Sequence, residues 1–176
     1  MKAARYRTWL PALLGLVIGT AAHAADDGFY IGGSMGRSSE SYDPYTFNAY
    51  GANVGYDLAV GFRPIDLFAG ELSYTSFGRA FNGLNYVDTN AVGLFALGFL
   101  PVPVVDLYGR LGLADWRTGA NSPGLSFTRT GADVAYGVGG GMHIGSIGVR
   151  VEYTRFTVSH ASDIDLASIG LTWTLL

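Results

Sequence analysis

The sequence predicts an all-β protein: an eight-stranded antiparallel, up-and-down β-barrel that spans a membrane. Hydrophobic residues make up 49% of the 176-residue chain and charged residues only 14%, which is a low charged fraction for a protein surrounded by water. Segments of alternating apolar and polar residues recur along the chain, whereas no apolar run reaches the roughly 20 residues of a transmembrane helix. Lipid offers no hydrogen-bond partners to the backbone, so strands that cross a membrane must close into a barrel.

The first 24 residues have the pattern of a secretory signal peptide, and we expect the barrel domain to cover 25–176. Basic residues lie within 2–7, an apolar run covers 9–22, and Ala22-His23-Ala24 matches an A-x-A cleavage site. An uncleaved N-terminal anchor helix is the alternative, but the apolar run is short for that role. The sequence therefore predicts an exported protein whose signal peptide is cleaved.

The composition argues against several classes of function. The net charge is −3, and every basic residue after residue 24 is arginine, so a general affinity for nucleic acid is not expected. The chain contains no cysteine, which leaves strand closure rather than disulfides to stabilise an exported protein. His143 and His160 are the only histidines after residue 24 and have no metal-ligand cluster around them, so we expect no metal and no cofactor.

The first two predicted strands cover 29–37 and 49–63. The first is glycine-rich and leads into a polar loop, 38–45. The second alternates throughout its length, with Asp57 and Arg63 on its polar face and an apolar face that reads Tyr50, Ala52, Val54, Tyr56, Leu58, Val60 and Phe62. This apolar face is suited to lipid.

The third and fourth predicted strands cover 67–77 and 89–100. A short turn, 64–66, precedes the third strand, which places Phe68, Leu72 and Tyr74 outward and Glu71, Ser73 and Thr75 inward. A longer loop is expected at 78–88. In the fourth strand the expected outward residues are Phe95, Leu97 and Phe99, an assignment that leaves Val92 and Leu94 pointing inward, against the pattern.

The fifth predicted strand covers 104–116 and follows a turn at Pro101-Val102-Pro103, because two prolines cannot donate to a central ladder. It places three leucines outward, Leu107, Leu111 and Leu113, and three polar residues inward, Asp106, Tyr108 and Arg110. Another long loop is expected around Asn121-Ser122-Pro123-Gly124.

The last three predicted strands cover 136–144, 147–154 and 165–176, and Gly145-Ser146 is suited to a tight hairpin turn between the first two of them. Pairing Ile144 with Ile147 places Gly141 opposite Arg150 and Gly139 opposite Glu152. The two charged side chains therefore lie opposite glycines, which have no side chain. A loop at 159–164 precedes the last strand.

The lengths of the connections alternate between long polar loops after strands one, three and five and short turns after strands two, four and six. Outer-membrane barrels of Gram-negative bacteria have this asymmetry, with short periplasmic turns and longer extracellular loops. We therefore expect both chain ends in the periplasm and the protein in the outer membrane.

Several segments together resemble the OmpA-type eight-stranded outer-membrane β-barrel family. They are Gly55-Tyr56, Glu71-Leu72-Ser73-Tyr74, Leu107 to Gly112, Arg150-Val151-Glu152-Tyr153 and the closing Ser168 to Leu175. The resemblance implies that Ser168, Gly170, Trp173 and Leu175 form an assembly signal read by the barrel-insertion machinery. The chain departs from the family at its end, where Leu175-Leu176 replaces the usual terminal phenylalanine.

Inward-facing charges are the main candidate functional residues, because the interior of an eight-stranded barrel is just wide enough for side chains to fill. We expect a network of seven: Asp57, Arg63, Glu71, Asp106, Arg110, Arg150 and Glu152. The primary hypothesis is that these residues plug the barrel. A small gated, porin-like channel is the alternative, since the family resemblance implies members with narrow or gated conduction.

A second alternative is a lipid A deacylase-like esterase, because His160-Ala161-Ser162-Asp163 resembles the His-x-Ser-Asn motif of those barrel enzymes. Asp163 stands in place of the motif's asparagine, and no glutamate follows Ser162 to orient the base. A polar loop explains the same residues. We therefore expect no enzymatic activity and no catalytic residues.

The expected partners are outer-membrane lipid, lipopolysaccharide and a possible extracellular ligand bound through the loops. Two aromatic belts are expected at the membrane interfaces, one of Phe62, Phe68, Phe99 and Trp173 and the other of Tyr50, Tyr74, Tyr136 and Tyr153. Arg155, just above the second belt, would meet lipopolysaccharide phosphates.

Overall fold

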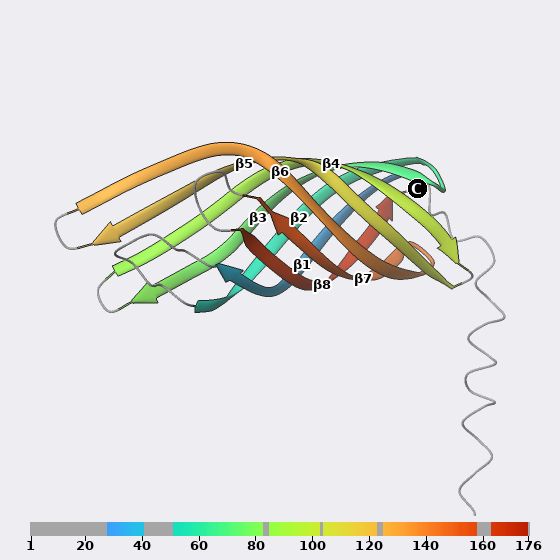
Figure 1. Ribbon diagram of the computed structural model, residues 1–176. Helices are drawn as coiled ribbons and strands as arrows, with labels where there is room; N and C mark the ends of the chain where they lie inside the picture. Colours follow the sequence, from blue (N-terminus) through green and yellow to red (C-terminus); the bar gives the residue numbers. More distant parts are fainter. Residues whose placement is uncertain are drawn as a thin grey trace, which may run out of the picture.

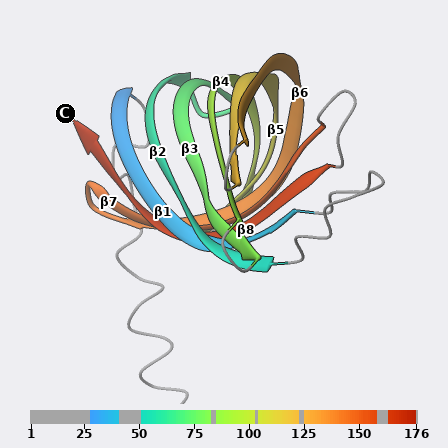
Figure 2. The same cartoon turned by 90° about the vertical axis from the view of Figure 1, so that its left-hand side faces the viewer.

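The protein is an all-β barrel of eight strands, each antiparallel to its neighbours, as the sequence predicted (Figure 1). The computed structural model describes residues 28–40, 51–82, 85–102, 104–122, 125–157 and 163–175. β8 pairs with β1 and closes the barrel, so that within these residues every strand has two neighbours in the sheet (Figure 2). No helix within these residues is long and apolar enough to cross a membrane.

The strands lie close to their predicted positions, although several are longer than expected. In chain order they are β1 Gly28–Glu40, β2 Gly51–Ile65, β3 Phe68–Asn82, β4 Asn85–Val102, β5 Val105–Ser122, β6 Leu125–Ile144, β7 Ile147–Phe156 and β8 Ile164–Leu175.

Side chains alternate between the lumen and the outer surface along each strand, because successive residues of a strand point to opposite faces. On β5, Leu111 is 60% exposed while its neighbour Arg110 is 3% exposed. The predicted orientations of β2, β3, β5 and β7 are confirmed in the same way. The exposed face is apolar and the lumen contains the charges, which is the arrangement expected of a barrel in lipid.

The predicted orientation of β4 was wrong. Phe95 and Leu97 are each 2% exposed and point into the lumen, whereas Leu94 is 67% exposed and faces outward with Val92. Residues on both faces of this strand are apolar, so alternation of polarity could not decide between them. The lumen accepts Phe95 because Gly93 and Gly112 beside it have no side chains; a Cβ on either would overlap its ring.

Two of the predicted long loops are largely strand. β3 runs to Asn82 and β4 starts at Asn85, while β5 runs to Ser122 and β6 starts at Leu125. The polar residues of these segments therefore lie largely on strands rather than in loops. Figure 1 shows β3 to β6 reaching well beyond the ends of β7 and β8 on one side of the barrel.

The connections at the opposite end are short. The hairpin between β6 and β7 turns at Gly145-Ser146 with Ile144 opposite Ile147, as predicted. The turn between β4 and β5 differs from the prediction, because Pro101 lies within β4 opposite Asp106 and Val104 adopts a positive φ of 81°. Following the rule for outer-membrane barrels, we take this end as periplasmic and the end with the protruding strands as extracellular.

Aromatic side chains are exposed near both ends of the outer surface. Phe62, Phe68 and Trp173 are exposed toward the periplasmic end, and Tyr74, Tyr136 and Tyr153 toward the extracellular end. Phe99 was wrongly included in the first belt: its ring lies in the lumen, 4.0 Å from the Arg63 guanidinium carbon. Tyr50 lies outside the described residues.

The orientation of β4 is testable with single cysteines, since the protein has none of its own. In refolded barrel in lipid vesicles, dissolved oxygen, which partitions into the bilayer, should strongly increase the relaxation rate of a nitroxide spin label attached at Leu94→Cys. A label at Leu72→Cys, on the exposed face of the neighbouring strand, is the positive control. A weak effect of oxygen on the label at Leu94→Cys together with a strong effect at Phe95→Cys would instead support the orientation predicted from the sequence, with Phe95 outward and Leu94 inward.

Candidate functional site

Five charged side chains from four strands meet in the middle of the lumen, and we call them the charge layer. β2 provides Asp57, β3 Glu71, β5 Arg110, and β7 both Arg150 and Glu152. All five are buried, although only Arg150 and Glu152 are close together in the sequence. The barrel brings them together because each occupies an inward position of its strand.

Glu71 is the centre of the charge layer and is 1% exposed. Arg150 Nη1 donates a hydrogen bond of 2.9 Å to Glu71 Oε2, and Arg110 Nη2 lies 3.2 Å from Glu71 Oε1. The hydroxyl of Tyr30 donates a further 2.9 Å bond to Oε2. One carboxylate thus contacts two arginines and a tyrosine hydroxyl.

The remaining members of the charge layer are joined through the same two arginines. Arg150 Nη2 donates to Asp57 Oδ1 at 3.3 Å, and Arg110 Nη1 donates to Glu152 Oε1. Glu152 also accepts bonds of 2.9 Å from the hydroxyls of Tyr108 and Thr154. Every carboxylate of the layer therefore contacts an arginine across the lumen.

The other two predicted charges form a separate pair nearer the periplasmic end. Arg63 Nη1 donates to Asp106 Oδ2 at 3.0 Å, and Arg63 Nη2 donates to the carbonyl oxygen of Asp66 at 2.6 Å. His143 Nδ1 lies 3.9 Å from the same carboxylate oxygen of Asp106. The seven predicted residues thus form one cluster of five and one pair.

Tyr30 is a member of the cluster that the sequence reasoning missed, and Tyr108 was identified only as an inward residue. The two tyrosines share a local pattern: Tyr30 pairs with Gly61 and Tyr108 pairs with Gly139, and each ring lies over its glycine. An inward tyrosine paired with a glycine on the neighbouring strand is therefore the sequence pattern from which these two tyrosines could have been predicted. Gly139 lies opposite Tyr108 on one side and Glu152 on the other, and the space above it is occupied by the Tyr108 ring.

Gly139→Ala tests this packing. The added Cβ would overlap the Tyr108 ring, so we expect the free energy of unfolding to fall by about 1–3 kcal/mol. Gly109→Ala is the matched control, because a Cβ there would point outward, would come no closer than 3.9 Å to the Gly137 carbonyl oxygen, and should change stability little. Urea titration of the refolded barrels measures both. Equal stability of the two variants would contradict the packing described.

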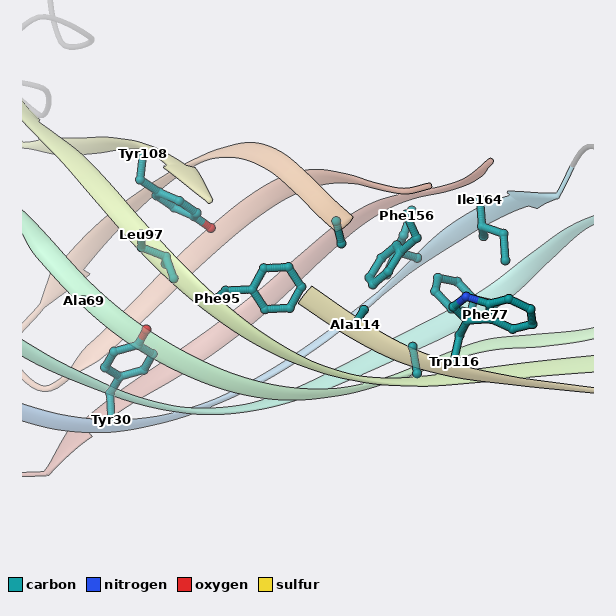
Figure 3. Packing of buried hydrophobic residues seen from close by; sticks show 13 residues of the cluster. Tyr30, Ala69, Phe77, Phe95, Leu97, Tyr108, Ala114, Trp116, Phe156 and Ile164 are labelled. Carbon is teal, nitrogen blue, oxygen red and sulfur yellow. The ribbon is translucent and has the colours of Figure 1, made fainter. Parts of the chain in front are cut away.

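An aromatic layer of Phe77, Phe95 and Phe156 lies in the lumen on the extracellular side of the charge layer. Phe77 and Phe156 meet edge to face with ring centroids 4.9 Å apart, and Phe95 and Phe156 do so at 6.4 Å. Arg110 joins the two layers, since its guanidinium carbon lies 3.7 Å from the centre of the Phe95 ring. Figure 3 shows Phe95 between the Leu97–Tyr108 region and the Phe156–Phe77 region of the lumen.

The residues proposed as an assembly signal lie on β8. Trp173 and Leu175 are exposed on the outer surface, whereas Gly170 is buried between Arg150 and Ser34 of the neighbouring strands. His160 and Ser162 of the esterase-like motif lie outside the described residues.

Comparison with known proteins identifies the family. The family described as "outer membrane protein beta-barrel domain" matches residues 10–174. No curated protein sequence matches the chain significantly.

Several solved structures share the fold. Ail, the attachment invasion locus protein of Yersinia pestis, is 19% identical with a TM-score of 0.63, over 84% of this chain and 98% of Ail. Neisserial surface protein A is 16% identical with a TM-score of 0.66, over 84% and 97% of the two chains. The N-terminal β-barrel domain of Pseudomonas aeruginosa OprF is 13% identical with a TM-score of 0.61, again over 84% and 97%.

The closed eight-stranded barrel, its apolar outer surface and the family match agree with one another. The chain belongs to the outer membrane protein β-barrel domain family, and is thus an outer-membrane β-barrel protein.

Proposed function

We propose that this protein is a closed, non-enzymatic outer-membrane scaffold whose specific activity lies in contacts made outside the membrane. The observation that supports the proposal is that two layers of buried, mutually contacting side chains, the charge layer and the aromatic layer, lie one after the other along the lumen. A pore needs a continuous wet path, and two successive layers of buried side chains in contact with one another oppose such a path.

The charge layer supports closure because its members are buried and bonded to one another. Moving a solute past them would require separating Arg110 or Arg150 from its carboxylates inside a narrow barrel. Truncating one partner of such a pair leaves an uncompensated buried charge at a cost of roughly 3–5 kcal/mol. The paired arrangement is therefore the stable one.

The aromatic layer supports closure independently of charge. Phe77, Phe95 and Phe156 are almost completely buried, and their rings contact one another across the lumen. An apolar constriction of this kind opposes ion passage because it does not replace an ion's hydration shell. A rearrangement of salt bridges alone would leave this second barrier in place.

The proposed partners follow from the outer surface. The two aromatic belts suit lipid at the membrane interfaces, and the exposed arginines Arg37 and Arg117 near the extracellular ends of β1 and β5 suit lipopolysaccharide phosphates. Arg155 donates to Asp165 at 2.7 and 2.9 Å, so its charge is shared with that carboxylate. β8 carries the proposed signal for the barrel-insertion machinery, and an extracellular ligand would bind beyond the membrane.

Ion efflux from lipid vesicles tests the proposal. Vesicles loaded with potassium chloride and containing refolded wild-type barrel should lose ions no faster than empty vesicles. Vesicles containing a known open porin at the same protein-to-lipid ratio provide the positive control. Rapid efflux through the wild-type barrel would replace this proposal with the porin-like alternative.

A further inference from the structure

The charges within the charge layer do not balance. Its members are three carboxylic acid side chains, Asp57, Glu71 and Glu152, and two guanidinium groups, Arg110 and Arg150. Arginine stays charged in proteins, so the layer would carry one net negative charge if all three acids were ionised. All five side chains are buried, and a buried charge without a compensating partner is costly. The layer is therefore short of one positive charge.

Two of the three acids are well suited to the ionised state. Glu71 contacts both arginines of the layer and accepts the hydroxyl hydrogen of Tyr30. Glu152 accepts hydrogen bonds from Arg110 and from two hydroxyl groups. Hydrogen bonds donated to a carboxylate favour its charged form. The missing positive charge is therefore not needed at either glutamate.

Asp57 is the least compensated acid of the layer. Within the described residues its one arginine contact runs from Arg150 Nη2 to Asp57 Oδ1 at 3.3 Å, the longest arginine–carboxylate distance in the layer. Arg150 makes its shorter bond, 2.9 Å, to Glu71. The charged groups around Asp57 are the other four members of the layer, and its register partners on the flanking strands are uncharged, Ser34 of β1 and Thr75 of β3. Asp57 is 3% exposed, so water does not supply the compensation.

Thr75 provides a partner for a proton on Asp57. Thr75 Oγ1 lies 2.7 Å from Asp57 Oδ2. This separation suits an O–H···O hydrogen bond, and a hydroxyl oxygen can accept as well as donate. A proton on Oδ2 can therefore be donated to Thr75 Oγ1 while Oδ1 accepts from Arg150. Both oxygens of the acid would then be bonded in its neutral form.

We propose that Asp57 keeps a proton in the folded barrel at neutral pH and that this proton makes the charge layer electrically neutral. The layer would then contain two guanidinium groups, two carboxylates and one carboxylic acid. The proposal goes beyond the proposed function, because it makes the stability of the closed lumen depend on the pH of the surroundings.

The direction of the pH dependence follows from proton counting. An aspartate of the unfolded chain ionises with a pKa near 3.9, so above about pH 5 the folded barrel binds one proton more than the unfolded chain. Stability falls with rising pH wherever the folded state binds more protons. Between about pH 5 and the pH at which folded Asp57 ionises, the barrel should therefore become less stable as the pH rises.

Infrared spectroscopy at neutral pH detects the proton directly, because a protonated carboxyl group has a carbonyl stretch that a carboxylate lacks. The sample is refolded full-length barrel in octyl glucoside micelles, since this detergent contains no carbonyl group. The wild type should show the band and Asp57→Asn should lack it. Asp115→Asn, an exposed aspartate on the outer face of β5, is the control and should keep the band. A wild type without the band, or a band that Asp57→Asn leaves unchanged, would overturn the proposal.

Urea titration in lipid vesicles from about pH 6 to about pH 8 measures the linked stability. One extra bound proton changes the unfolding equilibrium constant by about tenfold per pH unit. The constant of the wild type should therefore rise about tenfold per pH unit relative to that of Asp57→Asn, for as long as folded Asp57 keeps its proton. His143 is present in both proteins, so the comparison isolates Asp57. Parallel pH dependence of the two proteins would contradict a proton on Asp57.

A bound monovalent cation is the other way to supply the missing charge, and exchange of salts distinguishes it from a proton. At neutral pH, replacing sodium chloride with choline chloride at equal ionic strength should leave the urea midpoint of the wild type unchanged. A stabilisation by sodium that the wild type shows and Asp57→Asn lacks would assign the charge to a cation and overturn the proposal. None of these results depends on conductance, so failure here is distinct from failure of the closed-barrel proposal.

Discussion

Glu71→Ala should lower the free energy of unfolding of the refolded barrel by roughly 3–5 kcal/mol. Glu71 contacts both Arg110 and Arg150 and accepts the Tyr30 hydroxyl, and it is nearly fully buried. Its removal leaves two guanidinium groups in the lumen with fewer compensating charges. Urea titration in lipid vesicles, followed by tryptophan fluorescence, measures the loss.

Ser73→Ala is the matched control for this prediction. Ser73 lies two residues further along β3, points into the same lumen and is buried, but within the described residues its hydroxyl has no hydrogen-bond partner. Its replacement should change stability by less than about 1 kcal/mol. A loss for Glu71→Ala no larger than that for Ser73→Ala would show that the charge layer does not stabilise the barrel.

Phe156→Ala should also destabilise the barrel by about 3–5 kcal/mol, because it opens a cavity in the aromatic layer and removes edge-to-face contacts with Phe77 and Phe95. The charge layer beneath would remain intact, so this variant should still not conduct. Leu113→Ala, on the exposed outer face, is the control and should cost much less. Similar losses for the two variants would argue against a packed aromatic layer in the lumen.

Much of the fold could be predicted from the sequence because polarity alternates clearly on most strands. On β7, Val149 and Val151 face lipid while Arg150 and Glu152 face the lumen, so charge and apolarity give the same orientation. On β4 both faces are apolar, and the inward position of Phe95 depends on its neighbours in space: Gly112 of β5, the Arg110 guanidinium and the Phe156 ring. Those neighbours are determined by the register of strands distant in the sequence.

The protruding strands were mistaken for loops for a different reason. Outside the membrane both faces of a strand contact water, so Thr128 and Thr130 of β6 resemble loop residues. The charged residues of the lumen were identified from inward parity, but the tyrosine that donates to Glu71 was not. Tyr30 lies 41 residues from Glu71 in the sequence, and the two meet only when the barrel closes.

Single-channel recording from wild-type barrel in a planar bilayer tests the closure of the lumen most directly, because it resolves brief openings that an efflux assay averages. With the charge layer and the aromatic layer both in place, the recording should show a flat baseline over a wide range of voltages. Recurrent unitary current steps from the purified wild-type protein, absent from bilayers without it, would contradict a closed barrel.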